Sequence, residues 1–400
     1  MIYGETVADW ERVGMYQRVI NLPSLLEKRS HFLFGPRATG KSTLIRASLP
    51  EAKIYDLLDA DTYRRLLSEP KLIEQETLPT QLVVIDEIQK LPLLLDEVHR
   101  LIERRRQTFL LTGSSARKLR HGGANLLAGR AFQAELFPLI HREIPNFNLL
   151  GYLNSTGLPE FYADDLASEF LRNYVGVYLR EEVQAESLVR NLAAFSRFLD
   201  VIAVSNGDEI NYASLASDCG VPVRTLEGYF SILDDTLIGF RVEPYLQTVK
   251  RKGITRAKYW LFDIGVVNSL AKRGRIEIGS EMFGKAFEHF IALELRAYLS
   301  YRREPLALQY WRSTSKFEVD FILDGQIAIE VKATKQVADK HLKGLRALAE
   351  EGKMKVLGVV SLDPDYRYTA DGLHIWPWST FLSQLWHGTL GERPPHIKHR

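Results

Sequence analysis

The chain has 400 residues, of which 46% are hydrophobic and 26% are charged, and its formal net charge is only +2. This composition excludes a disordered chain, and the length predicts two or three folded domains. The single cysteine, Cys219, excludes an internal disulfide and a multi-cysteine zinc site. There is no apolar run of about 18 residues and no apolar signal core near the N-terminus, so a cytoplasmic protein without a membrane span is expected.

A phosphate-binding loop is the first motif along the chain. An apolar stretch that ends at Phe34 runs into GPRATGKS, which a helical pattern follows. This is the motif G-x-x-x-x-G-K-[ST] in its strand–loop–helix setting. Lys41 is expected to reach the terminal phosphates, and Ser42 to bind Mg²⁺. The predicted nucleotide-binding residues are Gly35, Pro36, Arg37, Ala38, Thr39, Gly40, Lys41, Ser42 and Thr43.

A second motif, VVIDE, ends an apolar run at residues 81–87. At the end of a buried strand Asp86 is expected to hold Mg²⁺, and Glu87 to orient and polarise the attacking water. The alternative is an ordinary acid pair that caps a helix. A third buried strand, TFLLTGSS, is expected to place Thr112, Ser114 or Ser115 beside the γ-phosphate as a polar sensor.

These strands alternate with helical patterns, as over residues 91–106, so a parallel sheet covered by helices is expected. The motifs all fall at the carboxyl ends of the strands, where such sheets bind ligands. Arg130 stands just before a further strand, AFQAELF. It is a candidate arginine finger for a neighbouring subunit's γ-phosphate, with Arg117 as the competitor. Pairing of Arg130 with a nearby acid is the alternative.

The segments GPRATGKST, VVIDEIQ, LLTGSS and LAGRAFQAELFPL together resemble a family of prokaryotic AAA+-type ATPases with a C-terminal domain of unknown function. The similarity extends to KYWLFDIGVVN, FEHFIALEL and IAIEVKA, and so covers nearly the whole chain. The resemblance implies an ATP-binding P-loop domain but supplies no substrate.

The middle of the chain predicts a winged helix. Residues 209–245 contain a short helix, a turn at Cys219-Gly220, and a second helix whose core stripe is Val223, Leu226, Phe230 and Leu233. The strands that follow are interpreted as a wing. Five basic residues between and beside them are candidates for nucleic-acid contact: Lys250, Arg251, Lys252, Arg256 and Lys258. The alternative is a packing module with a solvated basic turn.

A hairpin near the C-terminus, EVDFILDGQIAIEVK, carries three acids and a lysine that matter for function. Burial of both apolar sets on one face requires an odd loop length. Residue 322 is then predicted to pair with 326, with Gly325 in a left-handed conformation. The same register gathers Asp320, Glu330 and Lys332 on the opposite face.

Crowded carboxylates need a counter-charge, and oxygen ligands favour Mg²⁺ or Mn²⁺, so Asp320 and Glu330 are candidate metal ligands. The arrangement resembles the PD-(D/E)xK nuclease fold, in which a helix glutamate often joins the site; here Glu288 is the matching residue. It is similar in this respect to archaeal Holliday-junction resolvases. The first motif is Val-Asp rather than Pro-Asp, which leaves a degenerate nuclease fold, with Lys332 paired to Glu330, as the alternative.

These observations predict an α/β protein with three domains: a P-loop ATPase domain at 1–145, a helical and winged-helix domain at 146–264, and a nuclease-like domain at 265–400. The leading hypothesis is an ATP- and Mg²⁺-dependent oligomer, such as a hexameric ring, that acts on branched or single-stranded DNA. Holliday-junction branch migration or processing, in recombination, repair or defence, is its sharpest form. An ATP-gated protein-binding switch and an ATP-regulated nuclease are the alternatives.

Overall fold

The structure is a computed structural model that describes residues 16–114, 127, 129–162, 164–178, 191–303 and 306–392. The chain divides into two compact units. The first comprises Met1–Asn148, Ser155–Ser196 and Arg224–Gly239, and the second comprises Leu149–Asn154, Arg197–Val223 and Phe240–Arg400. The candidates Ser115 and Arg117 lie outside the described residues. No described helix is long and apolar enough to cross a membrane.

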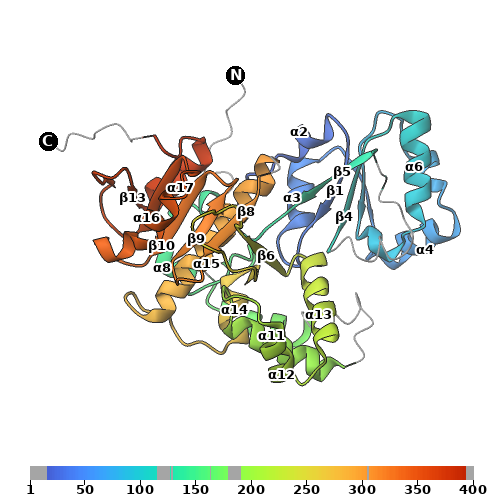
Figure 1. Cartoon of the computed structure of the whole chain (residues 1–400). Coiled ribbons are helices and arrows are strands. Elements are labelled where there is room, and N and C mark those ends of the chain that lie inside the picture. The colour runs from blue at the N-terminus through green and yellow to red at the C-terminus, as the bar shows by residue number, and fades with distance from the viewer. Residues whose placement is uncertain are drawn as a thin grey trace. The chain divides into compact units, whose positions relative to one another are not determined.

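The first unit is built on a sheet of five strands, in the order β2 (Lys53–Asp56), β3 (Val83–Asp86), β4 (Phe109–Gly113), β1 (Ser30–Phe34) and β5 (Ala131–Glu135) (Figure 1). Every pairing in it is parallel. Strands β1, β3 and β4 are buried along their whole length, which explains their continuous apolar sequences. The predicted parallel sheet is confirmed.

Helices cover both faces of this sheet. Helix α6 (Leu94–Arg105) lies on one side and α3 (Lys41–Ser48) on the other (Figure 1). Leu94, Val98 and Leu101 of α6 follow the helical spacing of one face and pack in the same core as the strands. The other described helices of this unit are α2 (Leu22–Leu26), α4 (Ala60–Ser68), α5 (Leu72–Glu76), α9 (Ala167–Asn173), α13 (Val223–Asp235), and the short η1 (Ile88–Lys90), η2 (His141–Glu143) and η3 (Tyr174–Tyr178).

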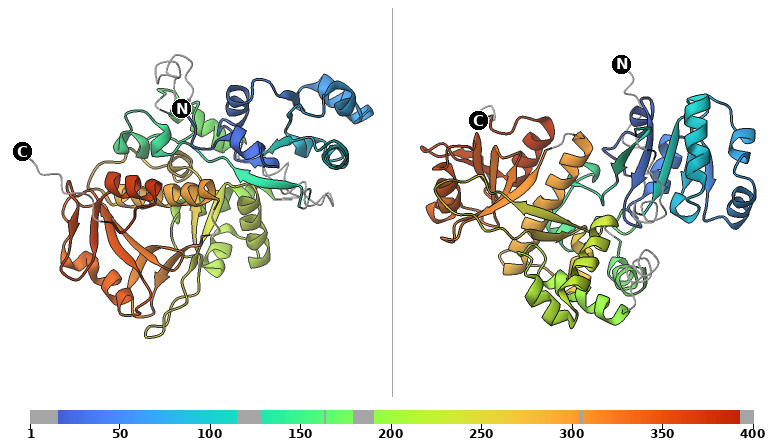
Figure 2. Two further views of the ribbon diagram at one scale, coloured as in Figure 1. Left: turned by 90° about the horizontal axis from the view of Figure 1, so that it is seen from above. Right: turned by 45° about the vertical axis from the view of Figure 1, so that its right-hand side comes forward.

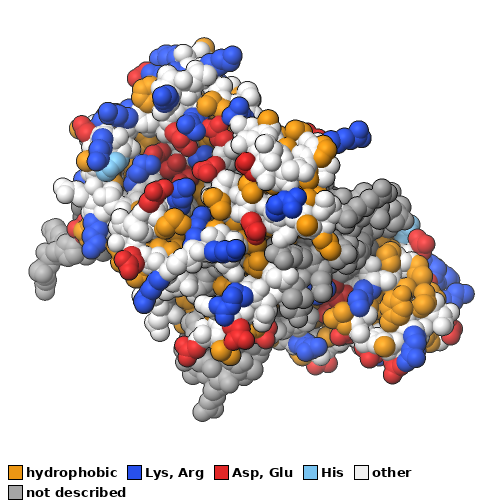
Figure 3. Space-filling view, turned by 90° about the horizontal axis from the view of Figure 1, so that it is seen from below, with side chains coloured by type: hydrophobic (Ala, Val, Ile, Leu, Met, Phe, Trp, Pro, Cys, Tyr) orange, Lys and Arg blue, Asp and Glu red, His pale blue; other side chains and the backbone are white. Residues whose placement is uncertain are grey.

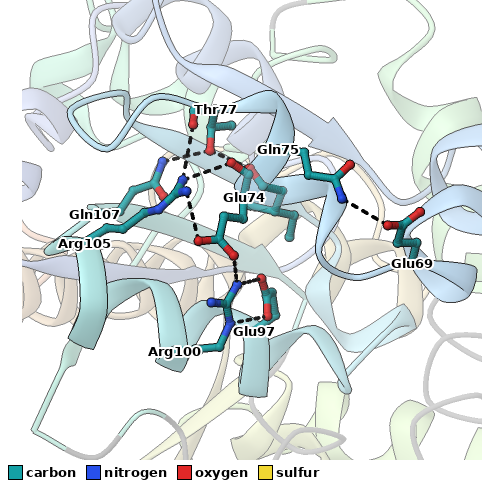
Figure 4. Close-up of polar contacts among 9 residues, drawn as sticks. Glu69, Glu74, Gln75, Thr77, Glu97, Arg100, Arg105 and Gln107 are labelled. Atoms are coloured by element: carbon teal, nitrogen blue, oxygen red, sulfur yellow. Dashed lines mark hydrogen bonds and ion pairs between the residues drawn. The ribbon is translucent and has the colours of Figure 1, made fainter.

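A polar network fixes α5 against α6 (Figure 4). The Glu74 carboxylate accepts a hydrogen bond from Arg100 and lies 2.9 Å from Arg105. Arg100 also pairs with Glu97. The Gln107 amide donates to Thr77 at 3.1 Å and to the Leu78 carbonyl at 3.0 Å, so the backbone that follows α5 is satisfied as well.

The second unit contains a mixed sheet of eight strands. Their order is β12 (Arg367–Tyr368), β13 (His374–Pro377), β11 (Val356–Ser361), β10 (Ile327–Lys332), β9 (Glu318–Leu323), β8 (Leu308–Arg312), β6 (Gly239–Pro244) and β7 (Lys258–Leu261). Strand β9 is antiparallel to both neighbours, β8 and β10, whereas β10, β11 and β13 run parallel.

Long helices pack on this second sheet. Helices α15 (Glu281–Arg302) and α17 (Trp378–His387) lie side by side across one face (Figure 2), while α16 (Lys343–Ala349) packs against β9 and β10 in a different core cluster. The remaining described helices of this unit are α8 (Leu149–Leu153), α12 (Tyr212–Cys219), α14 (Ile264–Leu270) and η4 (Asp339–Leu342); α11 (Leu192–Val204) spans the division between the units.

The middle segment differs from the predicted winged helix. The two helices form, α12 and α13, with Gly220 at φ 65° between them. Leu226, Phe230 and Leu233 are buried as predicted, but Val223, expected in the same stripe, is 41% exposed. The strands expected to form a separate wing are β6 and β7 of the eight-stranded sheet, because β6 pairs with β8.

The hairpin of β9 and β10 confirms the parity of the predicted loop and corrects its register. Leu323 pairs with Ile327 and Ile322 with Ala328, so the prediction that residue 322 pairs with 326 is wrong by two positions. A shift of two leaves every side chain on its predicted face. Gly325 has φ 65° as expected, and Asp324 before it is also left-handed, at φ 50°.

Candidate active site

The phosphate loop follows β1 directly and ends where α3 begins. Gly40, the residue before α3, has φ 86°, which only glycine adopts without strain. A side chain at Gly35 would place its Cβ 2.4 Å from the Leu136 carbonyl oxygen. Both glycines of the motif are therefore required by the backbone, as the sequence predicts. Ala38 between them is also left-handed, at φ 63°.

The side chain of Lys41 is hydrogen-bonded to the backbone of its own loop. Lys41 is 7% exposed, and its ammonium group donates hydrogen bonds to the carbonyls of Gly35, at 2.7 Å, and Pro36, at 3.1 Å. The Thr39 hydroxyl also donates to the Pro36 carbonyl, at 2.8 Å. A phosphate in the loop would offer the ammonium group charged acceptors in place of these neutral ones, and would so add the attraction of opposite charges to the hydrogen bonds.

Three predicted residues meet at the ends of the strands. The Ser42 hydroxyl donates to Asp86 Oδ2 at 2.8 Å, and the Thr112 hydroxyl donates to Asp86 Oδ1. Thr112 Oγ1 in turn accepts from the Glu87 amide at 3.2 Å. Hydroxyl and carboxylate oxygens are the ligands that Mg²⁺ prefers, so Ser42 and Asp86 fit this ion.

Glu87 leaves the strand in a strained conformation, with φ 61°. Its carboxylate accepts a hydrogen bond from the Gln89 amide, which is 8% exposed. Gln89 lies on the single turn η1, and its Nε2 is also 3.5 Å from Ser114 Oγ. Gln89 is not among the predicted site residues, although its position two residues after Glu87 is a usable signal.

A cavity of about 1550 Å³ opens over the loop. Its lining includes the loop residues, the segment at 16–23, and the aromatic side chains Phe161, Phe170 and Tyr174. Arg18 connects the segment at 16–23 to the phosphate loop, because its guanidinium donates hydrogen bonds to the carbonyls of Thr39, at 2.7 Å, and Phe137, at 2.6 Å. Tyr174 donates to the Arg37 carbonyl at 3.3 Å. Sequence reasoning did not find Arg18, because nothing local marks its partners.

Arg130 stands immediately before β5 and forms an ion pair with Glu103 of α6. This contact holds the pKa of the Glu103 carboxyl below its usual value. The alternative considered for Arg130, pairing with an acid, is therefore what this chain shows, and the finger role stays a prediction.

The five basic residues of the supposed wing separate into two groups. Arg251 pairs with Glu350 at 2.6 Å and donates to the Ala347 carbonyl at 2.9 Å, and Lys258 is 5% exposed. Lys250, Lys252 and Arg256 are exposed. On the face drawn in Figure 3, Lys and Arg side chains are interspersed with Asp and Glu rather than gathered in one basic surface.

The predicted acidic residues of the hairpin do lie together. Lys332 Nζ is 2.5 Å from Glu330 Oε1 and 3.7 Å from Asp320 Oδ2. Asp320 also accepts from the Val331 amide at 2.8 Å. Burial and the neighbouring Asp320 raise the pKa of Glu330 well above its ordinary value.

Glu288 of α15 joins this group, as the sequence predicts. Its carboxylate lies 3.5 Å from the Lys258 ammonium, which is 2.7 Å from Glu318. Burial and the charge of Asp320 raise the pKa of Glu288 to about 7. We call Glu288, Glu318, Asp320 and Glu330 the carboxylate cluster. Sequence reasoning missed Glu318 as a partner of a lysine, and it placed Lys258 among the nucleic-acid contacts.

A metal ion was predicted at Asp320 and Glu330, and the geometry does not fit one. Among the described residues there is no group of three or more His, Cys, Asp or Glu arranged to hold a metal ion. Lysine ammonium groups occupy the space between the carboxylates instead.

Comparisons with known proteins divide the chain into three segments. Residues 27–145 match the family described as an AAA domain, and residues 147–277 and 283–381 match two families described as domains of unknown function, DUF8612 and DUF4143. An uncharacterized protein of Methanocaldococcus jannaschii, MJ1637, is 23% identical over 416 residues, which cover 89% of this chain and 85% of that protein.

Among solved structures, the Aeropyrum pernix ORC1 protein in complex with DNA is 12% identical with a TM-score of 0.26, covering 66% of this chain and 91% of that one. The family match and the loop geometry agree over the same residues. Residues 27–145 therefore contain a P-loop and match the AAA domain family.

Proposed function

We propose that this protein hydrolyses ATP at the phosphate loop. The observation that carries the proposal is the set of hydrogen bonds that joins Ser42 of α3, Asp86 of β3 and Thr112 of β4. Mg²⁺ bound by Ser42 and Asp86 would neutralise charge on the phosphates. Lys41 would exchange the Gly35 and Pro36 carbonyls for phosphate oxygens, and the loop amides would bind the others.

Glu87 is the general base of this proposal. It follows the strand that carries Asp86, and its carboxylate can orient and polarise a water only after the Gln89 amide releases it. Thr112, fixed between Asp86 and the Glu87 amide, is the sensor residue. Arg130 would leave Glu103 and act on the γ-phosphate of a neighbouring subunit in a homo-oligomer such as a hexameric ring.

The finer proposal is that hydrolysis is used on branched or single-stranded DNA, with Holliday-junction migration or processing as its sharpest form. Three exposed cations, Lys250, Lys252 and Arg256, support it, because they are available to phosphates. Helices α12 and α13 follow one another as in a helix-turn-helix.

A second candidate function is an ATP-gated switch whose nuclease-like part binds protein. The lysines within the carboxylate cluster favour it, because they fill the place where a nuclease would need a metal.

One comparison separates the two candidates. ATP hydrolysis is measured with duplex, single-stranded and four-way DNA, for the wild type and for a Lys250→Ala/Lys252→Ala/Arg256→Ala variant. The DNA proposal predicts stimulation and salt-sensitive binding, with a salt slope that falls by about 3 in the variant. A control variant at three other exposed lysines, Lys316, Lys335 and Lys340, should keep the slope. Hydrolysis that no DNA changes, with no salt-sensitive binding, would favour the switch.

A further inference from the structure

The carboxylate cluster contains a cation that its sequence motif does not supply. Glu288 lies on α15, Glu318 and Asp320 on β9, and Glu330 and Lys332 on β10. Lys258 comes from β7, a strand outside the helix and hairpin that carry the motif. A fourth element is not needed to bring the acids together, so the presence of this second lysine requires its own explanation.

Lys258 is enclosed by negative groups. Its side chain is 6% exposed, and its ammonium group lies 2.7 Å from Glu318 Oε1 and 3.5 Å from Glu288 Oε1. The ring of Tyr310 covers it with a centroid 5.2 Å away. Burial opposes its charge, but the charges of Glu288, Asp320 and Glu318 outweigh this and raise the pKa of Lys258 above its ordinary value. The side chain is therefore a permanent cation.

The remaining acids are neutralised in the same way. Lys332 lies against Glu330 and within 3.7 Å of Asp320. A divalent ion requires several oxygens at about 2.0–2.6 Å, and here it would have to enter between two ammonium groups that repel it. Glu330 Oε2 is buried without a hydrogen-bond partner among the described residues, so the cluster retains an acceptor that a lysine does not reach.

We propose that Lys258 is the resident cation of the carboxylate cluster, where it takes the place of a divalent metal ion. The nuclease-like part of this chain then binds no catalytic metal and does not hydrolyse phosphodiesters by a metal-dependent route. Removal of the Lys258 ammonium leaves Glu288 and Glu318 facing a vacated position, with Asp320 on the same strand as Glu318, and a divalent cation can enter once these side chains rotate toward it. This inference stands apart from the ATPase proposal, since it concerns different residues.

The test counts Mn²⁺ ions bound to the nucleotide-free, full-length protein by electron paramagnetic resonance of the free ion. Four proteins are compared: wild type, Asp320→Asn, Lys258→Met and Lys258→Met/Asp320→Asn. All retain Ser42 and Asp86, so any Mn²⁺ bound there cancels in the comparison. We expect equal stoichiometry for the wild type and Asp320→Asn, one additional Mn²⁺ per chain in Lys258→Met, and loss of that ion in the double variant. Lys340→Met, at an exposed lysine, is the control and should match the wild type.

Two results would overturn the inference. The first is a Mn²⁺ ion in the wild type that Asp320→Asn removes, or plasmid cleavage by the wild type that depends on Mn²⁺ and Asp320. The second is a folded Lys258→Met protein that gains no ion. If Lys258→Met folds only when Mn²⁺ is present, that dependence itself supports the exchange of cations. Two measurements test the inference even if Lys258→Met does not fold. One is the Mn²⁺ count of the wild type, and the other is that of the charge-conserving variant Lys258→Arg, which should bind no additional ion.

Discussion

Two carboxylates of this chain, the buried Asp86 and the partly exposed Glu288, have different kinds of neighbour. Asp86 accepts hydrogen bonds from the hydroxyls of Ser42 and Thr112, which are neutral and can rotate toward an arriving ion. Glu288 faces the Lys258 ammonium, a fixed charge that an arriving ion must displace. At the scale of single residues, the first carboxylate is prepared for a metal and the second is already neutralised.

The raised pKa of Glu288 predicts a specific pH dependence of stability. With a pKa of about 7 in the folded chain against an ordinary value of 4.5, the folded state binds more protons than the unfolded state between these two values. The free energy of unfolding therefore falls as pH rises through that window, by about 2 kcal/mol after allowance for partial exposure, and is flat above it.

Glu288→Gln should remove this decline, which urea unfolding at several pH values between 5 and 8 can measure. Glu281→Gln, at an exposed position on the same helix, is the control and should leave the decline unchanged. An unaltered slope in Glu288→Gln would show that another group is responsible.

Gln89 predicts an unusual effect on the reaction rate. Its amide donates a hydrogen bond to the Glu87 carboxylate, which must break before Glu87 can act on water. Gln89→Leu should therefore raise the basal rate of ATP hydrolysis roughly fivefold, which corresponds to the loss of one hydrogen bond of about 1 kcal/mol. Steady-state phosphate release measures this. Gln107→Leu, at another buried glutamine of the same unit, should lower stability without raising the rate. A rate in Gln89→Leu that drops toward that of a Glu87 variant would mean that Gln89 positions the base productively.

At the scale of elements, the close packing of α16 on β9 depends on a glycine. A Cβ at Gly344 would lie 1.9 Å from the Glu318 carbonyl oxygen, so the helix could not keep its distance from the strand. Gly344→Ala should lower the free energy of unfolding by about 1–3 kcal/mol, as overpacking does. It should also disturb Glu318, and with it Lys258.

The matched control is Gly284→Ala on α15, where nothing lies within 4 Å of the added Cβ. This change should stabilise the helix by about 0.5–1 kcal/mol. Chemical denaturation of both variants measures the difference, and equal effects would contradict the proposed close approach.

Elements set by local pattern could be predicted from the sequence. The phosphate loop, the buried strands before Asp86 and Thr112, and the face shared by Asp320, Glu330 and Lys332 each follow from a few neighbouring residues. Partners distant in sequence could not be predicted. Strands β6 and β7 join the large sheet through pairing with β8, some 65 residues away along the chain, at Glu243 and Gln309. Lys258 reaches Glu288 and Glu318 only because of that placement.

At the scale of the whole molecule, each of the two units has its own sheet and its own core cluster. The net charge of +2 gives no general attraction for nucleic acid, so any binding must be local. The phosphate loop belongs entirely to the first unit.

A ligand that binds the first unit should therefore stabilise that unit alone. Mg²⁺-ATP at a hundredfold excess over Kd should raise the free energy of unfolding of the first unit by about 2.7 kcal/mol. Scanning calorimetry should therefore show one transition that moves to a higher temperature and another whose temperature does not change. Lys41→Ala should abolish the shift. Equal movement of all transitions would show that the two units unfold as one.

The most direct test of the account separates ATP binding from ATP hydrolysis in three proteins. Binding of labelled ATP and release of phosphate are measured on the same samples of wild type, Glu87→Gln and Lys41→Ala. We expect the wild type to bind and hydrolyse Mg²⁺-ATP, Glu87→Gln to bind it with little hydrolysis, and Lys41→Ala to do neither. Hydrolysis by Glu87→Gln at the wild-type rate, or tight binding by Lys41→Ala, would contradict this expectation.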